Sequence, residues 1–470
     1  MKTIFQRRDL GNLRGLGRFG ADRSGNVAII YAMMAIVLMI AIGAAVDIGR
    51  WLHARDQTIS AVDAAVLAGG RWLQTNQNDT AGAIATAQKF YAQNVSSRLP
   101  VTGDSITFAI GSDGMSMTAS GTAYIQTPFL QFASIDKLPL LSTATTQFSQ
   151  AQLAVGGNGG QNLEVAMMLD ITGSMAGQKL TDLKTSATDL VNIVVWDDQS
   201  KFTSKVAIVP FSEDIRLPTT TAINSARGTS LPATRSVTTD FGFFQMTSTY
   251  YLSDCVVERT GTQKYTDAAP ATGQYVMGHY TTNFTGTTTK KGVCTVPAGA
   301  EVMPLSSDKT ALLAKINGLS AAGGTAGHLG TAWAWYMLSP NWSSLWSSSS
   351  TPAAYGSANL EKIAILMTDG EYNTQYDSNG VAVNQNATTC PQAANGCSTA
   401  QARALCTAMK AKGIVVYTIG FQLGGNQTAI DTLNQCATEP GKFYTADDGS
   451  QLQQAFRDIA LKLTSLYLSK

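Results

Sequence analysis

Three short segments carry oxygen-donor side chains that could together hold a hard metal ion. They are Asp170-Ile171-Thr172-Gly173-Ser174, Gly323-Gly324-Thr325 and Thr368-Asp369-Gly370. Two carboxylates and three hydroxyls suit Mg²⁺ or Mn²⁺, which prefer six oxygen ligands and usually retain water. Because two carboxylates beside neutral hydroxyls leave the ion incompletely neutralised, a carboxylate from outside the chain is a natural sixth ligand. The expected ligands are Asp170, Thr172, Ser174, Thr325 and Asp369.

A parallel sheet is needed to bring these segments together. Helical patterns alternate with short apolar runs that predict buried strands. The runs cover residues 163–170, 205–211, 361–370 and 413–421. Such alternation predicts a doubly wound α/β sheet, in which ligands bind at the carboxyl ends of the strands. The first and third runs end at Asp170 and beside Asp369, so both carboxylates are expected at that edge.

An uncharged apolar stretch lies near the amino terminus, at residues 27–46. A helix of that length is about 30 Å long, the hydrocarbon thickness of a bilayer. Basic residues are concentrated in the preceding tail, residues 1–26, so the positive-inside rule keeps the tail in the cytoplasm and exports the rest. A cleaved signal peptide is the alternative, although the stretch is long for one. We expect a single-pass inner-membrane anchor, with the bulk of the chain in the periplasm or at the cell surface.

A small α+β module is predicted next, over residues 47–153. Residues 47–100 show helical periodicity in two pieces, which Gly69-Gly70 and the polar run at residues 74–80 are expected to separate. Strand patterns follow it. They cover residues 105–111, 115–127 and 138–147.

The α/β region is predicted to occupy residues 163–467. A Gly-rich linker at residues 154–162 precedes it. Two stretches interrupt its strand–helix rhythm, at residues 214–304 and 373–398, and we interpret both as insertions. Insertions of this kind either carry binding specificity or are loops without a role in binding, and the sequence leaves both readings open.

Composition argues against several classes of function. Lys and Arg number 33 against 32 Asp and Glu, a net charge of +1, so no nucleic-acid partner is expected. The three histidines, His53, His279 and His328, are scattered and match no zinc motif. The sequence also lacks a phosphate-binding loop and a nucleophile elbow. We therefore expect no enzymatic activity and no small-molecule substrate, and we expect His328 to pack inside the domain.

The oxygen-donor segments resemble the metal-ion-dependent adhesion site of von Willebrand factor A-type domains. That pattern is D-x-S-x-S, then a distant Thr, then a distant Asp in a D-G step. Asp170, Ser174, Thr325 and Asp369 match it, while Thr172 stands where the family more often has Ser. Since Thr keeps the hydroxyl, we expect metal binding to survive. The resemblance covers about residues 161–467.

The amino-terminal region is similar to TadG-like proteins of Tad/Flp pilus assembly. The resemblance rests on Arg23-Ser24-Gly25-Asn26, the membrane stretch, Val46-Asp47 with Arg50, and the helix segment Asp63–Gly69. It implies a role in pilus assembly or in envelope tethering and adhesion, and it identifies no ligand. From the metal chemistry we expect a protein partner that offers a carboxylate, a pilus or envelope component. Two alternatives are a structural tether whose metal site only stabilises the fold, and a hydrolase or chelatase accessory.

All six cysteines lie on the side predicted to be exported, where disulfides persist. Six cysteines allow 15 connectivities, and sequence alone selects none of them. Locality and the α/β layout favour three pairs as a hypothesis. These are Cys255–Cys294, Cys390–Cys397 and Cys406–Cys436.

Overall fold

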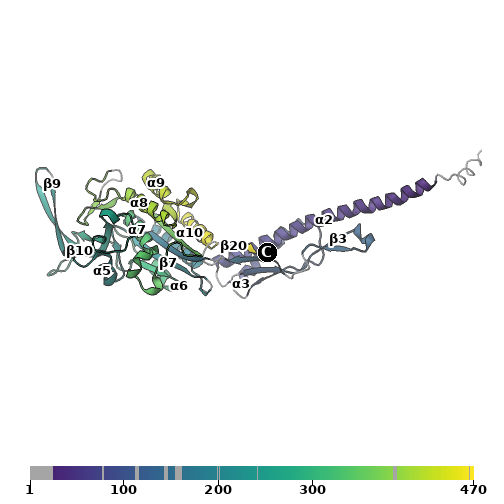
Figure 1. The fold of residues 1–470 in the computed structure, drawn as a ribbon, viewed down its shortest axis with the longest axis horizontal. Coiled ribbons are helices and arrows are strands. Elements are labelled where there is room, and N and C mark those ends of the chain that lie inside the picture. The colour runs from purple at the N-terminus through teal and green to yellow at the C-terminus, as the bar shows by residue number, and fades with distance from the viewer. Residues whose placement is uncertain are drawn as a thin grey trace, which may run out of the picture. The chain divides into compact units, whose positions relative to one another are not determined.

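The computed structural model describes residues 25–76, 79–111, 116–141, 147–153, 161–197, 199–200, 202–240, 242–384, 389–464 and 466–469. Most of the predicted basic tail and of the Gly-rich linker lies outside these residues. The chain divides into two compact units (Figure 1). The smaller comprises Met1–Gly69, Ala81–Ala151 and Leu468–Lys470; the larger comprises Gly70–Thr80 and Gln152–Tyr467.

One long helix, α2 (Gly25–Thr75), contains the apolar stretch. In the described part of the chain it is the one helix long and apolar enough to cross a bilayer. The predicted break at Gly69-Gly70 is wrong, because α2 continues through both glycines. A Cβ on Gly69 would lie 2.6 Å from the Met117 sulfur and 2.8 Å from the Ala83 carbonyl oxygen. Gly69 therefore serves close packing rather than a turn.

The smaller unit also contains helix α3 (Thr80–Asn94) and a four-stranded sheet in the order β1-β2-β5-β20. Its strands are β1 (Thr107–Ile110), β2 (Ser116–Ser120), β5 (Gln147–Leu153) and β20 (Leu466–Ser469), and a separate hairpin pairs β3 (Tyr124–Gln126) with β4 (Lys137–Pro139). The strand predicted over 115–127 is thus two strands, interrupted at Gly121, whose φ is +138°. Since β20 comes last in sequence, the chain leaves this sheet by β5 and returns to it at its carboxyl end.

The larger unit is built on a six-stranded sheet in the order β14-β7-β6-β15-β18-β19. The strands are β6 (Asn162–Asp170), β7 (Ser204–Phe211), β14 (Met303–Ser306), β15 (Leu360–Thr368), β18 (Val415–Phe421) and β19 (Phe443–Ala446). All pair in parallel except β14, which is antiparallel to β7. The doubly wound sheet and its four predicted strands are confirmed. Both edge strands were missed, because each has only four residues and no continuous apolar run.

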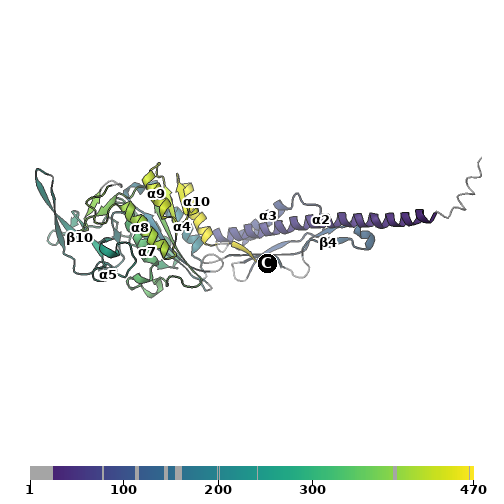
Figure 2. The same cartoon turned by 45° about the horizontal axis from the view of Figure 1, so that its top comes forward.

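Helices cover both faces of this sheet (Figures 1 and 2). One face packs against α4 (Gln178–Val194), α6 (Lys309–Asn317) and α10 (Gly449–Leu463), and the other against α7 (Gly327–Leu338) and α8 (Ser398–Ala411). Helix α9 (Gln427–Cys436) packs beside α8. Successive residues of β6 point to opposite faces: Met167 enters one core and Met168 the other. Burial on both faces explains why the strand reads as a continuous apolar run.

Residues 214–304 contain a second, four-stranded sheet, a helix and a separate two-stranded sheet. The elements are β8 (Ile215–Arg216), α5 (Thr220–Arg227), β9 (Thr234–Asp240), β10 (Gln245–Arg259), β11 (Val276–Thr281) and the separate pair β12 (Phe284–Thr285) and β13 (Lys291–Gly292). Strand β10 is central and pairs with β8, β9 and β11. The β9–β10 hairpin projects from the rest of this unit in both views (Figures 1 and 2). In residues 373–398, β16 (Thr374–Tyr376) pairs with β17 (Ala382–Asn384).

Three disulfides join the cysteines in the predicted pairs. The bonds are Cys255–Cys294, Cys390–Cys397 and Cys406–Cys436, with sequence separations of 39, 7 and 30 residues. The last bond links α8 to the end of α9, and the other two lie in the predicted insertions.

Loop length should rank the contributions of these bonds to stability. Replacing Cys255 and Cys294 together by Ser should lower the free energy of unfolding by about 4 kcal/mol, and replacing Cys390 and Cys397 by about 2–3 kcal/mol, because longer closed loops restrict the unfolded chain more. Denaturant titration of the two double variants measures the difference. Equal losses, or a larger loss for the short loop, would contradict this ranking.

Candidate metal centre at the carboxyl edge of the sheet

The site forms where β6 and β15 lie side by side and end together. Met367 of β15 pairs with Leu169 of β6, so Asp170 and Thr368 follow at the same level. Strand order also reverses here, because the chain runs outward from β6 through β7 on one side and from β15 through β18 on the other. Such a switch point is where doubly wound sheets bind ligands.

The first predicted segment curls around the Asp170 carboxylate. Thr172 donates its backbone N–H to Asp170 Oδ1 at 2.9 Å, and a 3₁₀ turn (Gly173–Met175) then leads into α4. The Thr172 and Ser174 hydroxyl oxygens lie 2.9 Å apart, and Ser174 Oγ donates to Asp369 Oδ1 at 2.7 Å. The structure therefore brings four of the five predicted ligands into one hydrogen-bonded group.

The fifth, Thr325, reaches the same edge through backbone hydrogen bonds. Gly173 N–H donates to the Gly323 carbonyl at 2.8 Å, which joins the first segment to the second. Thr325 is buried, and its carbonyl accepts the Asn373 N–H at 2.9 Å, which joins it to the chain after Asp369. Gly323 has a φ of +82°, and a Cβ there would lie 2.3 Å from Thr295 Cγ2. Glycine is required at this point by both conformation and space.

Electrostatics at the site are dominated by burial of negative charge. Burial, followed by the nearby negative charge of Asp369, raises the pKa of Asp170 from its ordinary value of 3.8 to about 6. Hydrogen bonds from Thr368 and Thr172 act in the opposite direction without overcoming these effects. Asp170 is fully buried and Asp369 is 6% exposed. A bound cation would relieve the repulsion between them.

A lysine that the sequence analysis did not identify occupies this site as well. Lys179, in the first turn of α4, places Nζ 2.8 Å from Asp369 Oδ2. Asp369 therefore receives a proton donor on each oxygen, from Ser174 and from Lys179. The position of Lys179 shortly after the D-x-T-G-S segment was the one sequence feature that could have identified it. Lysines are common on exposed helix turns, so that position alone did not indicate a role in the site.

A third carboxylate stands at the rim. Glu213 follows β7 and accepts the Gly324 N–H at 3.2 Å on Oε1 and the Thr295 hydroxyl at 3.0 Å on Oε2. It thus fixes the segment that carries Thr325 and links it to the end of the 214–304 region. The sequence signal was a carboxylate just after a predicted strand, at the same edge as Asp170.

A neighbouring cluster of potential ligands serves the fold instead. Asp214 lies within reach of Cys255 and Cys294, but both sulfurs are consumed in a disulfide. Its own oxygens accept the Thr295 and Val296 N–H groups, and His279 Nδ1 lies 2.7 Å away. Asp214 therefore holds the returning chain in place.

His328 packs inside the domain, as predicted. Its Nδ1 lies 2.6 Å from Ser398 Oγ and its Nε2 2.6 Å from Glu258 Oε2. The side chain is 1% exposed. These contacts connect α7 to α8 and to β10, and they involve none of the five predicted ligands.

The residues present fit a hard divalent cation. The donor set consists of carboxylate and hydroxyl oxygens, which is the chemistry that Mg²⁺ and Mn²⁺ prefer. Asp170, Thr172 and Thr325 lie in the wall, while Ser174 is exposed, so the group opens toward solvent on that side. An external ligand could reach an ion bound there.

Comparisons with known proteins match two regions of the chain. Residues 25–72 match the family model of Flp pilus-assembly TadE/G-like proteins, and residues 299–458 match the von Willebrand factor type A domain. The second match includes Thr325 and Asp369. Asp170 lies before the matched residues in sequence, at the end of β6, which pairs with β15 inside the matched region. No curated protein sequence matches the chain.

Solved structures resembling the chain do so at low identity. The von Willebrand domain of the type V pili tip protein Mfa5 from Porphyromonas gingivalis is 14% identical, with a TM-score of 0.35, covering 64% of this chain and 94% of that one. The pilus adhesin RrgA from Streptococcus pneumoniae is 10% identical, with a TM-score of 0.39, covering 77% and 50%. The pilus adhesin SpaC from Lactobacillus rhamnosus GG is 10% identical, with a TM-score of 0.36, covering 76% of this chain and 33% of that one. At these TM-scores, none of them bears on the function of this chain.

The two family matches agree with the sequence motifs and with the observed fold. The apolar helix lies in the first match, and the sheet edge that gathers the oxygen donors contains part of the second. This chain combines a segment similar to TadE/G-like pilus-assembly proteins with a von Willebrand factor type A domain.

Proposed function

We propose that this chain is a membrane-anchored, exported binding protein of Tad/Flp pilus assembly or envelope adhesion. In this proposal its type A domain binds a partner's carboxylate through Mg²⁺ or Mn²⁺. The observation that carries it is the convergence of two buried carboxylates and the Thr172 and Ser174 hydroxyls at the switch point of the sheet. The TadE/G-like match supports the pilus context.

The ion would be held by Asp170, Thr172, Ser174, Thr325 and Asp369. When bound, it supplies a positive charge that an acidic side chain from a partner can complete, since hard cations favour carboxylate ligands. The neighbouring residues do the positioning. Gly323 and Glu213 fix the Thr325 segment, while Thr368 orients Asp170 by donating to its Oδ2 at 2.6 Å. This is binding chemistry, and we propose no catalytic step.

Anchoring by α2 and export of the rest complete the proposal. The uncharged stretch at residues 27–46 is long enough to span a bilayer, and basic residues precede it. We place the amino terminus in the cytoplasm, the anchor in the inner membrane and the chain after residue 46 on the exported side. The three disulfides support this placement, because such bonds persist in oxidising compartments.

A second candidate function is a structural envelope tether whose site does not grip a partner. The ion pair between Lys179 and Asp369 favours it, because Asp369 already has a cationic partner within the chain. In that case divalent metal would affect stability at most, and partner binding would be indifferent to it.

Replacing Asp170 by Asn should abolish Mg²⁺ binding while stabilising the metal-free protein at neutral pH. The raised pKa means that ionisation of Asp170 opposes folding, so stability falls as the pH rises from about 4 to 6. A pKa of about 6 instead of 3.8 corresponds to a loss of roughly 3 kcal/mol at most in the free energy of unfolding. Asn keeps an oxygen to accept the Thr172 N–H. Calorimetric titration with Mg²⁺ and thermal unfolding in EDTA measure the two effects on the full chain in detergent.

The matched control is Asp447→Asn, an exposed carboxylate on the same unit. It should change neither property. Normal Mg²⁺ binding by Asp170→Asn would show that the metal site is wrongly assigned. A large loss of stability of Asp170→Asn in EDTA would show that the charge of Asp170 does not destabilise the metal-free fold.

Replacing Lys179 by Met should strengthen metal binding, because the ammonium and the ion compete for Asp369 Oδ2. Lys179 is a quarter exposed, so we expect about a tenfold gain in Mg²⁺ affinity, or ~1.4 kcal/mol. Lys184→Met is the control, since that lysine lies on the same helix and donates to the Asn317 carbonyl instead. Unchanged affinity in Lys179→Met would mean that the lysine does not compete with metal.

Binding to purified pili of the source bacterium tests the function itself. The wild-type chain should co-sediment with pili in Mg²⁺. Most of that binding should be lost when EDTA is added or when Asp170→Asn replaces the wild type, because the partner is proposed to bind the metal ion. Metal-independent co-sedimentation would support the tether instead. No association with pili under any of these conditions would contradict the pilus role.

A further inference from the structure

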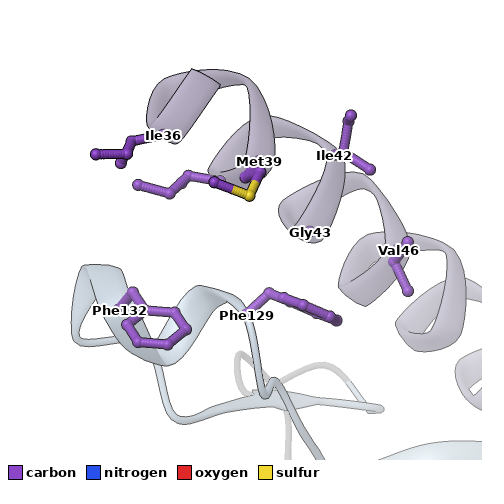
Figure 3. Close-up of a pocket in the computed structure, with 8 residues that line it drawn as sticks. Ile36, Met39, Ile42, Gly43, Val46, Phe129 and Phe132 are labelled. Atoms are coloured by element: carbon purple, nitrogen blue, oxygen red, sulfur yellow. The ribbon is translucent and has the colours of Figure 1, made fainter. Parts of the chain in front are cut away.

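A hydrophobic groove lies within the smaller unit, between α2 and the loop that joins β3 to β4 (Figure 3). It measures about 580 Å³, and its lining includes Ile36, Met39, Gly43 and Val46 of α2 with Phe129 and Phe132 of the loop. Figure 3 shows Phe129 below Gly43 and Phe132 nearer to Ile36 and Met39. The α2 side of the groove thus belongs to the same residues 27–46 that make up the apolar stretch.

The loop itself presents apolar side chains outward. Residues 128–135 read Pro-Phe-Leu-Gln-Phe-Ala-Ser-Ile, without a charge. Phe132 is 78% exposed, Phe129 44% and Ile135 41%. Exposed large apolar side chains gathered on one short loop are unusual for a surface that faces water, and they mark contact with a membrane or another apolar partner.

The backbone of this loop is prepared for an apolar environment. Phe129 and Leu130 both donate their N–H groups to Asp47 Oδ2 at 2.8 Å. The N–H groups of four further residues, Gln131, Phe132, Ser134 and Ile135, donate to carbonyls within the loop. Unpaired backbone groups are what normally exclude a loop from lipid. Asp47, itself buried and 3.6 Å from Arg50, therefore makes the loop compatible with lipid while staying at the edge of the stretch.

Distances along α2 place the loop at hydrocarbon depth. A Cβ on Gly43 would lie 2.7 Å from the Phe129 ring, so the two are in direct contact. Gly43 lies about 4.5 Å before the end of the stretch at Val46, and Met39 about 10 Å, at 1.5 Å per residue. Phe132, beside Met39, reaches deepest.

Residues that favour the membrane interface lie where the chain enters and leaves the loop. Lys137 Nζ is 4.4 Å from the centre of the Tyr124 ring, across the β3–β4 hairpin. Trp51, five residues beyond Val46 on α2, donates its indole N–H to the Pro139 carbonyl at 2.7 Å. Trp, Tyr and Lys are enriched at this level of a bilayer, with their polar ends toward the headgroups.

We propose that residues 128–135 form a second membrane contact, inserted beside α2 into the leaflet at the Val46 end. Lipid acyl chains occupy the groove, because its helical wall is continuous with the residues that span the bilayer. Asp47 is a positioning residue that holds the loop at this depth. The inference goes beyond the proposed metal-dependent binding and depends only on the membrane placement of α2.

Site-directed fluorescence tests this insertion in the full chain. The cysteines of the described chain are all in disulfides, so a single introduced thiol can be labelled with an environment-sensitive fluorophore. Phe132→Cys and Ile135→Cys report on the loop, Val37→Cys on the middle of the stretch, and Lys89→Cys on an exposed position of α3. Each variant is placed in phosphatidylethanolamine–phosphatidylglycerol nanodiscs that contain lipids with a nitroxide on the acyl chain.

Both loop probes should be quenched several-fold more strongly than the Lys89 probe, and adding Asp47→Ala should remove most of that difference. If the Val37 probe is quenched but both loop probes behave like Lys89, the anchor stands and the inserted loop is wrong. Loop probes that are shielded from water yet not quenched by lipid would show that protein covers the groove, either a second copy or a partner helix. That outcome would also overturn the proposal.

Discussion

Two carboxylates of like charge are held at adjacent strand ends, out of contact with water, and much of the larger unit is arranged around that constraint. Asp170 and Asp369 are brought together by the parallel pairing of β6 with β15. Burying such charges is costly unless each has partners. The site supplies four donors: the Thr172 amide and the Thr368 hydroxyl for Asp170, and the Ser174 hydroxyl and the Lys179 ammonium for Asp369. The remaining like-charge repulsion between the two carboxylates is the physical reason for proposing a cation at this site.

The loops around the carboxylates are fixed mainly by backbone hydrogen bonds. Gly173 bonds to Gly323, and Asn373 bonds to Thr325, so each of the three segments is joined to another. Glu213 adds a side-chain bond at the rim, next to the point where the 214–304 region begins and ends. The 214–304 region therefore borders the proposed metal site, where loops and insertions commonly carry binding specificity.

In the smaller unit a different buried carboxylate has a comparable role. Asp47 accepts two backbone N–H groups from the β3–β4 loop and fixes a segment that local sequence would leave free. Gly43 and Gly69, at two places along α2, let other parts of the unit approach the helix closely. The long helix is thus both an apolar stretch and the scaffold on which this unit packs.

Local patterns determined much of this protein. Apolar runs fixed the central strands, since burial on both faces demands them, and the ends of those strands located Asp170 and Asp369. Short sequence separations likewise favoured the three cysteine pairs. Tertiary structure alone decided the role of Lys179, whose partner lies 190 residues away in the chain. It also decided that Gly69 continues a helix, and that β20 completes a sheet begun far earlier. Each of these depends on neighbours in space, which sequence spacing does not record.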